Sequence, residues 1–250
     1  MEKVKFKNLR NKTLVGNLYT TNSKSIIIMA HGFTGDKSEW DRFDKIAESL
    51  NKIGYNILSF DFSGCGESDD DTLTVEKQVD DLNSAIKFVK SKGYQNIGLF
   101  GHSLGGLISL KCFTPKIITM VLWAPVTNKI KYMWDKRYSK EQLQELEDKG
   151  YLTLIRDKSV RRKILIDKQM LADRESVDQK DLLNNVNCPI LIIHGNKDES
   201  VPYTDSQDAI KLLSSDSELE IIDGANHGFY DHLDILIDLT KKWFIEHLKN

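Results

Sequence analysis

The stretch Gly101-His102-Ser103-Leu104-Gly105-Gly106 lies between two apolar segments, at 97–100 and 107–112. The first segment is typical of a buried strand and the second of a helix. Gly-x-Ser-x-Gly at such a junction predicts a very tight turn, in which the serine takes a strained backbone conformation and presents its hydroxyl group. Ser103 is therefore the candidate nucleophile. A glycine-rich turn with a capping serine is the alternative for so short a motif, and the surrounding pattern has to distinguish the two.

The chain around this turn alternates apolar runs with amphipathic segments. The apolar runs predict buried strands at 25–30, 55–60, 97–100, 117–123, 189–195 and 219–222. Helical spacing of apolar residues predicts helices over 40–50, 75–93, 206–213 and 233–248, besides the one after Ser103. Alternating residues over 4–8 and 13–20 predict an antiparallel hairpin at the edge of the sheet. This order predicts an α/β fold with a mostly parallel central sheet and helices on both faces.

The strand pattern disappears between residues 126 and 187, where charged residues are dense. A structureless loop of that length would be unusual in a compact domain, so we predict a small helical cap over the strand ends. Residues 1–125 and 188–250 then form one α/β core, and residues 126–187 form the cap. Within the cap, Trp134 and Tyr138 are candidates to line a substrate pocket together with Phe33, although aromatic residues also dock amphipathic helices on a sheet.

Composition narrows the classes of partner. The 250 residues include 35 basic and 37 acidic side chains, which leaves a formal charge of −2 and no basic excess of the kind that nucleic-acid binding needs. No stretch approaches the ~18 apolar residues of a membrane span, and the first residues carry charge without an apolar signal segment. We therefore expect no nucleic-acid partner, no integral membrane segment and a cytoplasmic location. The three cysteines are widely separated and predict reduced thiols. The sequence does not decide between a monomer and a homodimer.

Residues that could carry chemistry follow the predicted strands, at the edge where parallel strands place a ligand site. A serine hydroxyl needs a base within hydrogen-bond reach, and the base needs an orienting acid. Of the six histidines, His227 is the candidate base because it lies in a glycine-flanked loop after the last strand. His232 and His247 are expected at the surface, and His31, His102 and His194 are expected to have packing or supporting roles. Asp198 is the candidate acid, with Glu199 and then Asp223 as alternatives.

The developing oxyanion would need two amide donors. One is supplied by the residue after the nucleophile and the other by the loop after an earlier strand. Leu104 and Phe33 occupy those positions. The glycines of His31-Gly32-Phe33-Thr34-Gly35 allow that loop to fold back closely, and the Phe33 ring can form a pocket wall.

These motifs resemble those of α/β-hydrolase fold serine hydrolases. The resemblance covers nearly all of the chain except the cap, and it includes, in the order of the family, His31-Gly32-Phe33-Thr34-Gly35, residues 61–68, Gly101–Gly106, residues 194–198 and residues 224–227. The short cap and the His-Gly-Phe-Thr-Gly loop are most similar to bacterial monoacylglycerol lipases and cinnamoyl (feruloyl) esterases. Many of the latter have glutamine where this chain has Leu104, which keeps the amide donor but removes a polar side chain.

By that resemblance, the reaction is acyl transfer from a small or medium-sized carboxylic ester to Ser103 and then to water. It implies no cofactor and no metal, and the sequence contains neither metal-ligand spacing nor a phosphate-binding loop. Peptidases, thioesterases and carbon–carbon bond hydrolases use the same residues. A non-catalytic binding protein of this fold is an alternative of another class. An intact set of nucleophile, base, acid and oxyanion donors argues against it.

Overall fold

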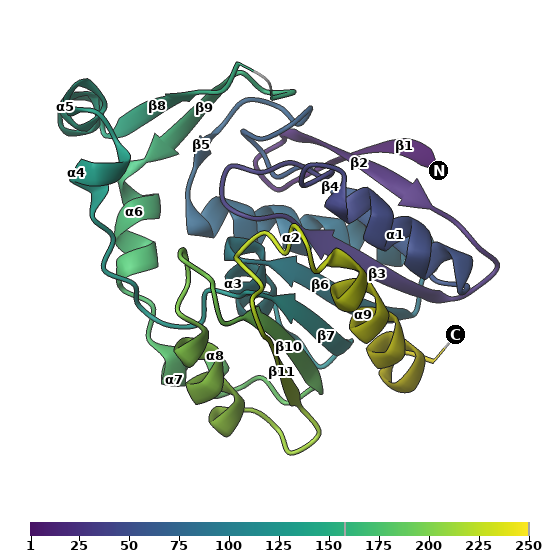
Figure 1. Cartoon of the computed structure of the whole chain (residues 1–250). Coiled ribbons are helices and arrows are strands. Elements are labelled where there is room, and N and C mark those ends of the chain that lie inside the picture. Colours follow the sequence, from purple (N-terminus) through teal and green to yellow (C-terminus); the bar gives the residue numbers. More distant parts are fainter. Residues whose placement is uncertain (158, 250) are drawn as a thin grey trace.

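The computed structural model describes residues 1–157 and 159–249, in which eight strands form one twisted sheet (Figure 1). Its order is β1-β2-β4-β3-β6-β7-β10-β11. The bounds are β1 Glu2–Lys7, β2 Thr13–Tyr19, β3 Ser25–Ala30, β4 Asn56–Phe60, β6 Asn96–His102, β7 Ile117–Trp123, β10 Ile190–Gly195 and β11 Glu218–Ile222. β2 is antiparallel to β1 and β4, and all other neighbours are parallel. The predicted edge hairpin and mostly parallel sheet are confirmed.

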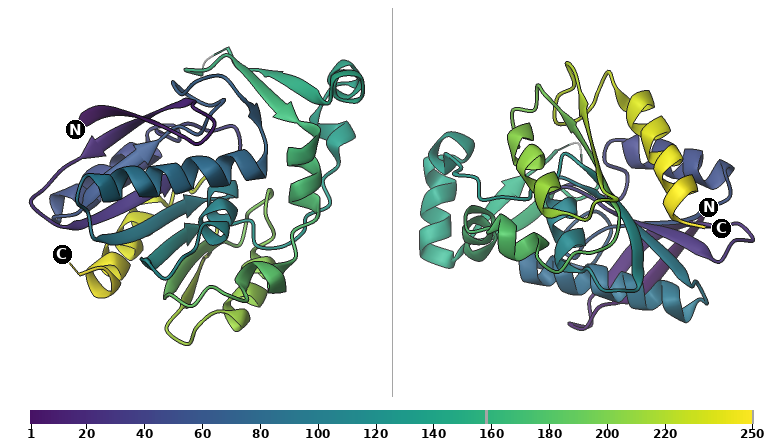
Figure 2. Two further views of the ribbon diagram at one scale, coloured as in Figure 1. Left: turned by 180° about the vertical axis from the view of Figure 1, so that it is seen from behind. Right: turned by 90° about the horizontal axis from the view of Figure 1, so that it is seen from below.

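Helices cover both faces of this sheet (Figures 1 and 2). α1 Arg42–Lys52 and α9 Leu233–His247 lie on one face, and α2 Val75–Ser91 and α3 Leu104–Lys111 lie on the other. α8 Tyr203–Ala209 continues into a short 3-10 turn, Ile210–Leu212, and packs against β10 and β11. Each matches a helix expected from periodicity. No helix within residues 1–157 and 159–249 has both the length and the apolar character needed to cross a membrane.

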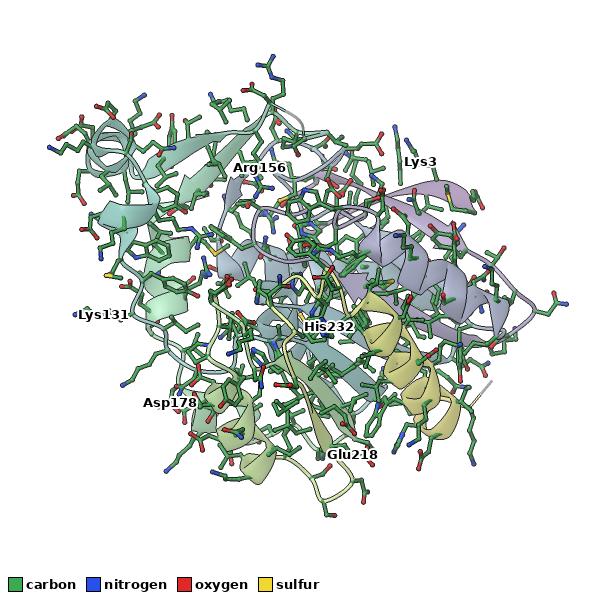
Figure 3. The ribbon with its side chains drawn as sticks, viewed as in Figure 1. Lys3, Lys131, Arg156, Asp178, Glu218 and His232 are labelled. Atoms are coloured by element: carbon green, nitrogen blue, oxygen red, sulfur yellow. The ribbon has the colours of Figure 1, made fainter. Side chains whose placement is uncertain are left out.

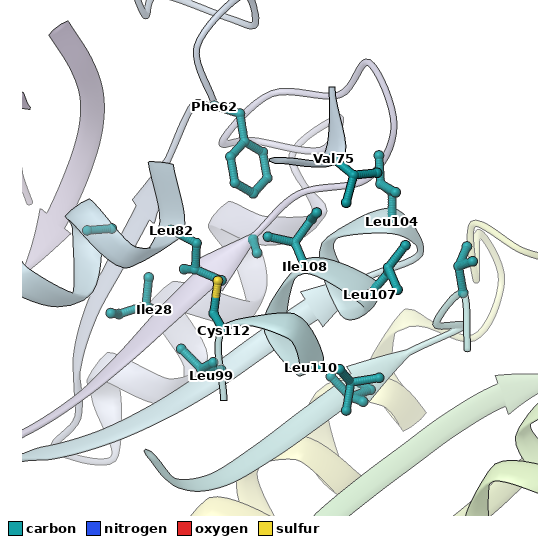
Figure 4. Packing of buried hydrophobic residues seen from close by; sticks show 14 of the residues in the cluster. Ile28, Phe62, Val75, Leu82, Leu99, Leu104, Leu107, Ile108, Leu110 and Cys112 are labelled. Atoms are coloured by element: carbon teal, nitrogen blue, oxygen red, sulfur yellow. The ribbon is translucent and has the colours of Figure 1, made fainter. Parts of the chain in front are cut away.

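The strand sequences explain why both faces must be covered. Successive side chains of a strand point to opposite faces, so a run such as 25–30 supplies apolar residues to each. Ile28 packs with Leu82 of α2 in the cluster drawn in Figure 4, whereas Ile27 packs in a second cluster with Phe43 of α1. Full burial of each such side chain contributes about 1.5–3 kcal/mol. The sheet is therefore a rigid base for the loops at its carboxyl edge.

The cap contains strands as well as helices, which corrects the expectation that it is purely helical. Its elements are α4 Trp134–Arg137, α5 Lys140–Lys149, β8 Tyr151–Ile155, β9 Lys163–Asp167, α6 Lys168–Glu175 and α7 Gln179–Leu183. β8 and β9 form an antiparallel hairpin, and β9 also pairs with β5 Thr72–Leu73 of the core. Only alternate residues, Leu152, Ile164 and Ile166, are fully buried. Short strands with one buried face give a weak signal among dense charges.

Arginine side chains hold the cap against loops of the core. Arg161 Nε donates to the Gly66 carbonyl oxygen at 3.1 Å, and another of its nitrogens forms an ion pair with Asp70. Arg156 Nη1 donates to the Thr34 carbonyl oxygen at 2.5 Å, where the cap meets the core (Figure 3). Thr34 follows β3 and Gly66 follows β4, so these contacts hold the cap near the carboxyl ends of the strands.

Candidate active site

Ser103 occupies the turn between β6 and α3 with φ 53° and ψ −115°. Such a backbone is uncommon for a residue with a side chain and costs on the order of 1–3 kcal/mol. A Cβ atom on Gly105 would lie 2.0 Å from the Ala30 carbonyl oxygen, and one on Gly101 would lie 2.7 Å from the Gly105 carbonyl oxygen. The strained turn that the motif predicts is therefore present, and it admits no side chain at either glycine.

His227 and Asp198 are brought together from separate loops. His227 Nδ1 donates to Asp198 Oδ2 at 2.6 Å, and Asp198 Oδ1 accepts from the amides of Ser200 and Val201 at 2.7 and 2.9 Å. The Asp198 side chain is completely buried, whereas that of His227 is 21% exposed. Burial alone would raise the pKa of Asp198, but hydrogen bonds from His194 and His227 hold it below its usual range. Asp198 is thus an ionised acceptor that orients the imidazole.

The alternative acids have other surroundings. Glu199 is exposed at the rim, and Asp223 accepts from Asn196 Nδ2 at 2.7 Å. Within the described residues neither forms a hydrogen bond with His227. This geometry favours Asp198 over both alternatives.

Two other histidines support the loops of this site. His194 Nε2 donates to Asp198 Oδ2 at 3.1 Å, and its Nδ1 lies 2.7 Å from Ser206 Oγ. His31 Nε2 accepts from the Phe62 amide at 3.2 Å, which leaves Nδ1 to donate to the Gly32 carbonyl oxygen at 2.8 Å. His194 therefore positions the acid, and His31 holds the loop that contains Phe33.

Glu39 is a site residue that the sequence did not indicate. Its side chain is buried, and Oε1 accepts from the Gly32 amide at 2.9 Å and lies 3.5 Å from His102 Nδ1. Burial alone would raise its pKa, but positive charge on His102 and the Gly32 hydrogen bond lower the pKa of Glu39 to about 2. A Cβ atom on Gly35 would lie 2.4 Å from Oε1. The loop therefore folds around a fixed carboxylate.

Phe33 and Leu104 approach each other because β3 and β6 are adjacent and parallel, with Ala30 opposite Gly101. Leu104 is the first residue of α3, and the first amides of a helix have no intrahelical acceptor. The positive end of the α3 dipole also lies there. Phe33 and Ser103 line one cavity. Phe33 and Leu104 thus follow the ends of two neighbouring strands, and Leu104 is not part of the described lining of that cavity.

The cavity that contains Ser103 and His227 has a volume of about 280 Å³. The core contributes Phe33 and other loop residues, and the cap contributes Tyr132, Arg137, Arg156 and Arg174. A larger groove of about 980 Å³ lies between α2, α3 and the cap helices α6 and α7, and its lining includes neither Ser103 nor His227. We place the site in the smaller cavity because the chemically active groups converge there.

The predicted pocket residues are not all in this lining. Phe33 is part of it, whereas Trp134 and Tyr138 are absent from its described walls. Tyr132 stacks on Trp134 with ring centroids 4.5 Å apart, and Trp134 stacks on Tyr138 at 5.8 Å. Tyr132 is the ring of this stack that reaches the cavity. Trp134 and Tyr138 therefore lie outside the described lining, next to Tyr132 in this stack, and their role in a substrate pocket stays a prediction.

Cys65 lies close to this region in sequence but carries no chemistry. Its side chain is fully buried, and burial raises the pKa of its thiol far above the usual range. A thiol that stays protonated is a poor nucleophile. This agrees with the packing role expected for it.

A protein-family model described as the alpha/beta hydrolase family matches residues 27–238. The chain therefore belongs to that family, as its motifs indicate. It is 23% identical over 244 residues to a monoglyceride lipase homolog of monkeypox virus, over 86% of this chain and 85% of that protein. It is 24% identical over 252 residues to a putative esterase/lipase of Mycoplasma genitalium, over 88% of this chain and 91% of that protein.

Among solved structures, Est1E of Butyrivibrio proteoclasticus with bound ferulic acid has a TM-score of 0.78 to this chain, at 22% identity and over 98% of each chain. A likeness at that identity establishes the fold. The names of the relatives support hydrolase activity of the esterase or lipase kind, and the fold predicted from the sequence is confirmed.

Proposed function

We propose that this protein is a serine carboxylic-ester hydrolase that uses Ser103 as nucleophile, His227 as general base and Asp198 as the orienting acid. The observation that carries the proposal is the 2.6 Å bond between His227 Nδ1 and buried Asp198, beside a cavity that also contains the strained Ser103 turn. Because Asp198 binds Nδ1, the neutral ring has Nε2 free to accept a proton. The esterase and lipase names of the relatives support the same class.

The reaction has two steps. His227 takes the hydroxyl proton as Ser103 Oγ attacks the ester carbonyl, and the tetrahedral oxyanion accepts hydrogen bonds from the Phe33 and Leu104 amides. His227 then gives the proton to the departing alcohol, and an acyl-enzyme remains. Water, deprotonated by His227, attacks that acyl group, the proton returns to Ser103 Oγ, and the carboxylic acid is released.

The test is hydrolysis of p-nitrophenyl butyrate by the wild type and by Ser103→Ala. We expect kcat to fall by about 10⁶, as happens when a serine nucleophile is removed. Asp198→Asn should lower kcat by about 10⁴, because the wrong tautomer of His227 is then favoured. Glu199→Gln is the matched control, since that exposed neighbour makes no bond to His227 in the described residues. Equal rates for wild type and Ser103→Ala would contradict the proposal.

A further inference from the structure

Arg174 of α6 is a buried cation whose hydrogen-bonding capacity is only partly used. The residue is 4% exposed, and its Nη2 donates to the Tyr132 hydroxyl at 2.7 Å. Nε and Nη1 are buried and have no hydrogen-bond partner among residues 1–157 and 159–249. Burying a charge without pairing it is costly, so an arginine kept in this state indicates a partner that binds from outside.

The ring contacts of Arg174 place this cation beside the proposed reaction centre. Its guanidinium carbon lies 4.3 Å from the centroid of the Phe33 ring and 4.3 Å from that of Tyr132, and all three residues line the Ser103 cavity or its wall. Stacking on aromatic faces partly compensates the desolvated charge while leaving the edge of the guanidinium plane for hydrogen bonds. The backbone amide of Phe33 is a proposed donor to the oxyanion, so the Arg174 guanidinium contacts the side chain of a residue of the proposed reaction centre.

Other arginines add positive charge to the same wall. The chain has seven arginines and 28 lysines, yet the cationic residues in the described lining are Arg42, Arg137, Arg156 and Arg174. Arg42 has a structural use, because it donates to the carbonyl oxygens of Glu39 and Gly228. Arg137 and Arg156 come from the cap, as Arg174 does, and the Arg137 guanidinium lies 5.8 Å from the Phe33 ring.

Carboxylates in the part of the chain that the structure describes do not pair with these cap arginines. Within the described residues, Arg137, Arg156 and Arg174 form no ion pair, and Glu175 accepts instead from the Tyr132 amide at 3.3 Å. Glu39 is occupied by the Gly32 amide, and Glu199 is exposed at the rim. Burial lowers the pKa of the Arg174 guanidinium, and the positive charge of Arg137 lowers it further. An anion bound there would relieve both effects.

We propose that Arg174, assisted by Arg137 and Arg156, binds a negatively charged group of the substrate, so that the enzyme hydrolyses short esters that carry a carboxylate or a phosphate. The inference rests on the proposed ester hydrolysis at Ser103. Two adjacent N–H groups of a guanidinium match either oxyanion in a bidentate arrangement. The cavity of about 280 Å³ is at the lower limit for a ligand site, which favours a short acyl chain between the anion and the ester carbonyl.

The experiment compares two p-nitrophenyl esters of the same chain length, the pentanoate and the monoester of glutarate. They differ only in a terminal methyl group or carboxylate. We expect the wild type to have a kcat/KM at least tenfold higher for the glutarate monoester, through a lower KM. Arg174→Met should reduce the ratio of the two kcat/KM values to about one. Arg174→Lys keeps the charge and should retain part of the preference.

Two further variants separate binding from folding. Arg137→Met changes an exposed residue and should lower the same ratio several-fold even if Arg174→Met fails to fold. Arg162→Met is the matched control, because Arg162 is exposed, pairs with Asp157 and is absent from the cavity lining. Arg162→Met should leave kcat/KM unchanged for both esters. The proposal is wrong if the wild type shows no preference for the glutarate monoester. It is also wrong if the variants lower kcat/KM equally for the two esters.

Binding to the Ser103→Ala variant distinguishes this inference from the proposed function. Calorimetry with glutarate and with inorganic phosphate tests the anion site without catalysis. The anion that binds more tightly shows whether a carboxylate or a phosphate is preferred. Binding that is lost in Ser103→Ala/Arg174→Met supports the anion site even if neither ester is hydrolysed. Hydrolysis of both esters without anion binding would overturn the inference and leave the hydrolase proposal intact.

Discussion

The core and the cap contribute to one cavity by different physical means. The core positions Ser103 and its partners with backbone, through parallel strands, tight glycine turns and loops that leave no room for another atom. The cap contributes side chains, among them two arginines on short helices and Arg156 in the loop after β8, and a few hydrogen bonds tie the cap to the core. Under the proposed function, the core would determine the reaction and the cap would determine which ester reaches Ser103.

The largest effect on stability is expected where the core has no space. Gly105→Ala would place a Cβ atom of α3 2.0 Å from the carbonyl oxygen of Ala30 in β3, and this helix cannot move away from the strand without disrupting the turn at Ser103. We expect a loss of about 4 kcal/mol or more, which would leave little folded protein. The measurement is urea unfolding followed by circular dichroism.

Gly150→Ala is the matched change in the cap. Gly150 has φ 75° at the end of α5, and a Cβ atom there would meet nothing within 4 Å. Only the left-handed backbone is unfavourable, so the expected cost is about 1–2 kcal/mol. Equal losses for the two variants would contradict the view that the core turn is limited by space.

A pH-dependent effect is expected at Glu39, which fixes the Gly32 amide. Its pKa is lowered from 4.5 to about 2 in the folded protein. A carboxylate whose pKa is lowered on folding stabilises the folded state at pH values above its pKa in the unfolded chain. This contribution is lost as the pH falls from about 4.5 to 2. Glu39→Gln should lower the free energy of unfolding at pH 7 and flatten its decline below pH 5. Parallel curves for variant and wild type would show that Glu39 makes no such contribution.

The smallest effect is expected at the attachment of the cap. Arg161→Met removes the contacts with Gly66 and Asp70 and should cost about 1 kcal/mol, with faster proteolysis of the cap. The neighbouring Arg162→Met removes only an exposed pair with Asp157 and should change stability by less than about 0.5 kcal/mol. If both variants are cleaved at the same rate, Arg161 does not hold the cap.

The same comparison explains which features could be predicted from the sequence. The core strands are continuous apolar runs, and the turn at Ser103 needs glycines at fixed positions, so local patterns were enough. His227 and Asp198 could be selected because each follows a strand whose end must lie at the ligand edge. Each of these signals is a pattern of residues that are close together in the sequence.

The cap lacks such signals. β9 is held by pairing with Thr72 and Leu73, which lie far away in sequence, and its other face is partly exposed. The position of Arg174 depends on the rings of Phe33 and Tyr132, and Glu39 acts through Gly32. Each of these relations exists only after folding, so an isolated arginine or glutamate in the sequence gave no indication of it.

The most direct test of the central claim is covalent labelling with a fluorophosphonate probe, followed by mass spectrometry of the digested protein. The account predicts one adduct, on the peptide that contains Ser103, with no labelling of Ser103→Ala and greatly slowed labelling of His227→Gln. Thermal melts of the three proteins check that each is folded. A folded wild type that is not labelled, or an adduct of equal yield in Ser103→Ala, would contradict the account.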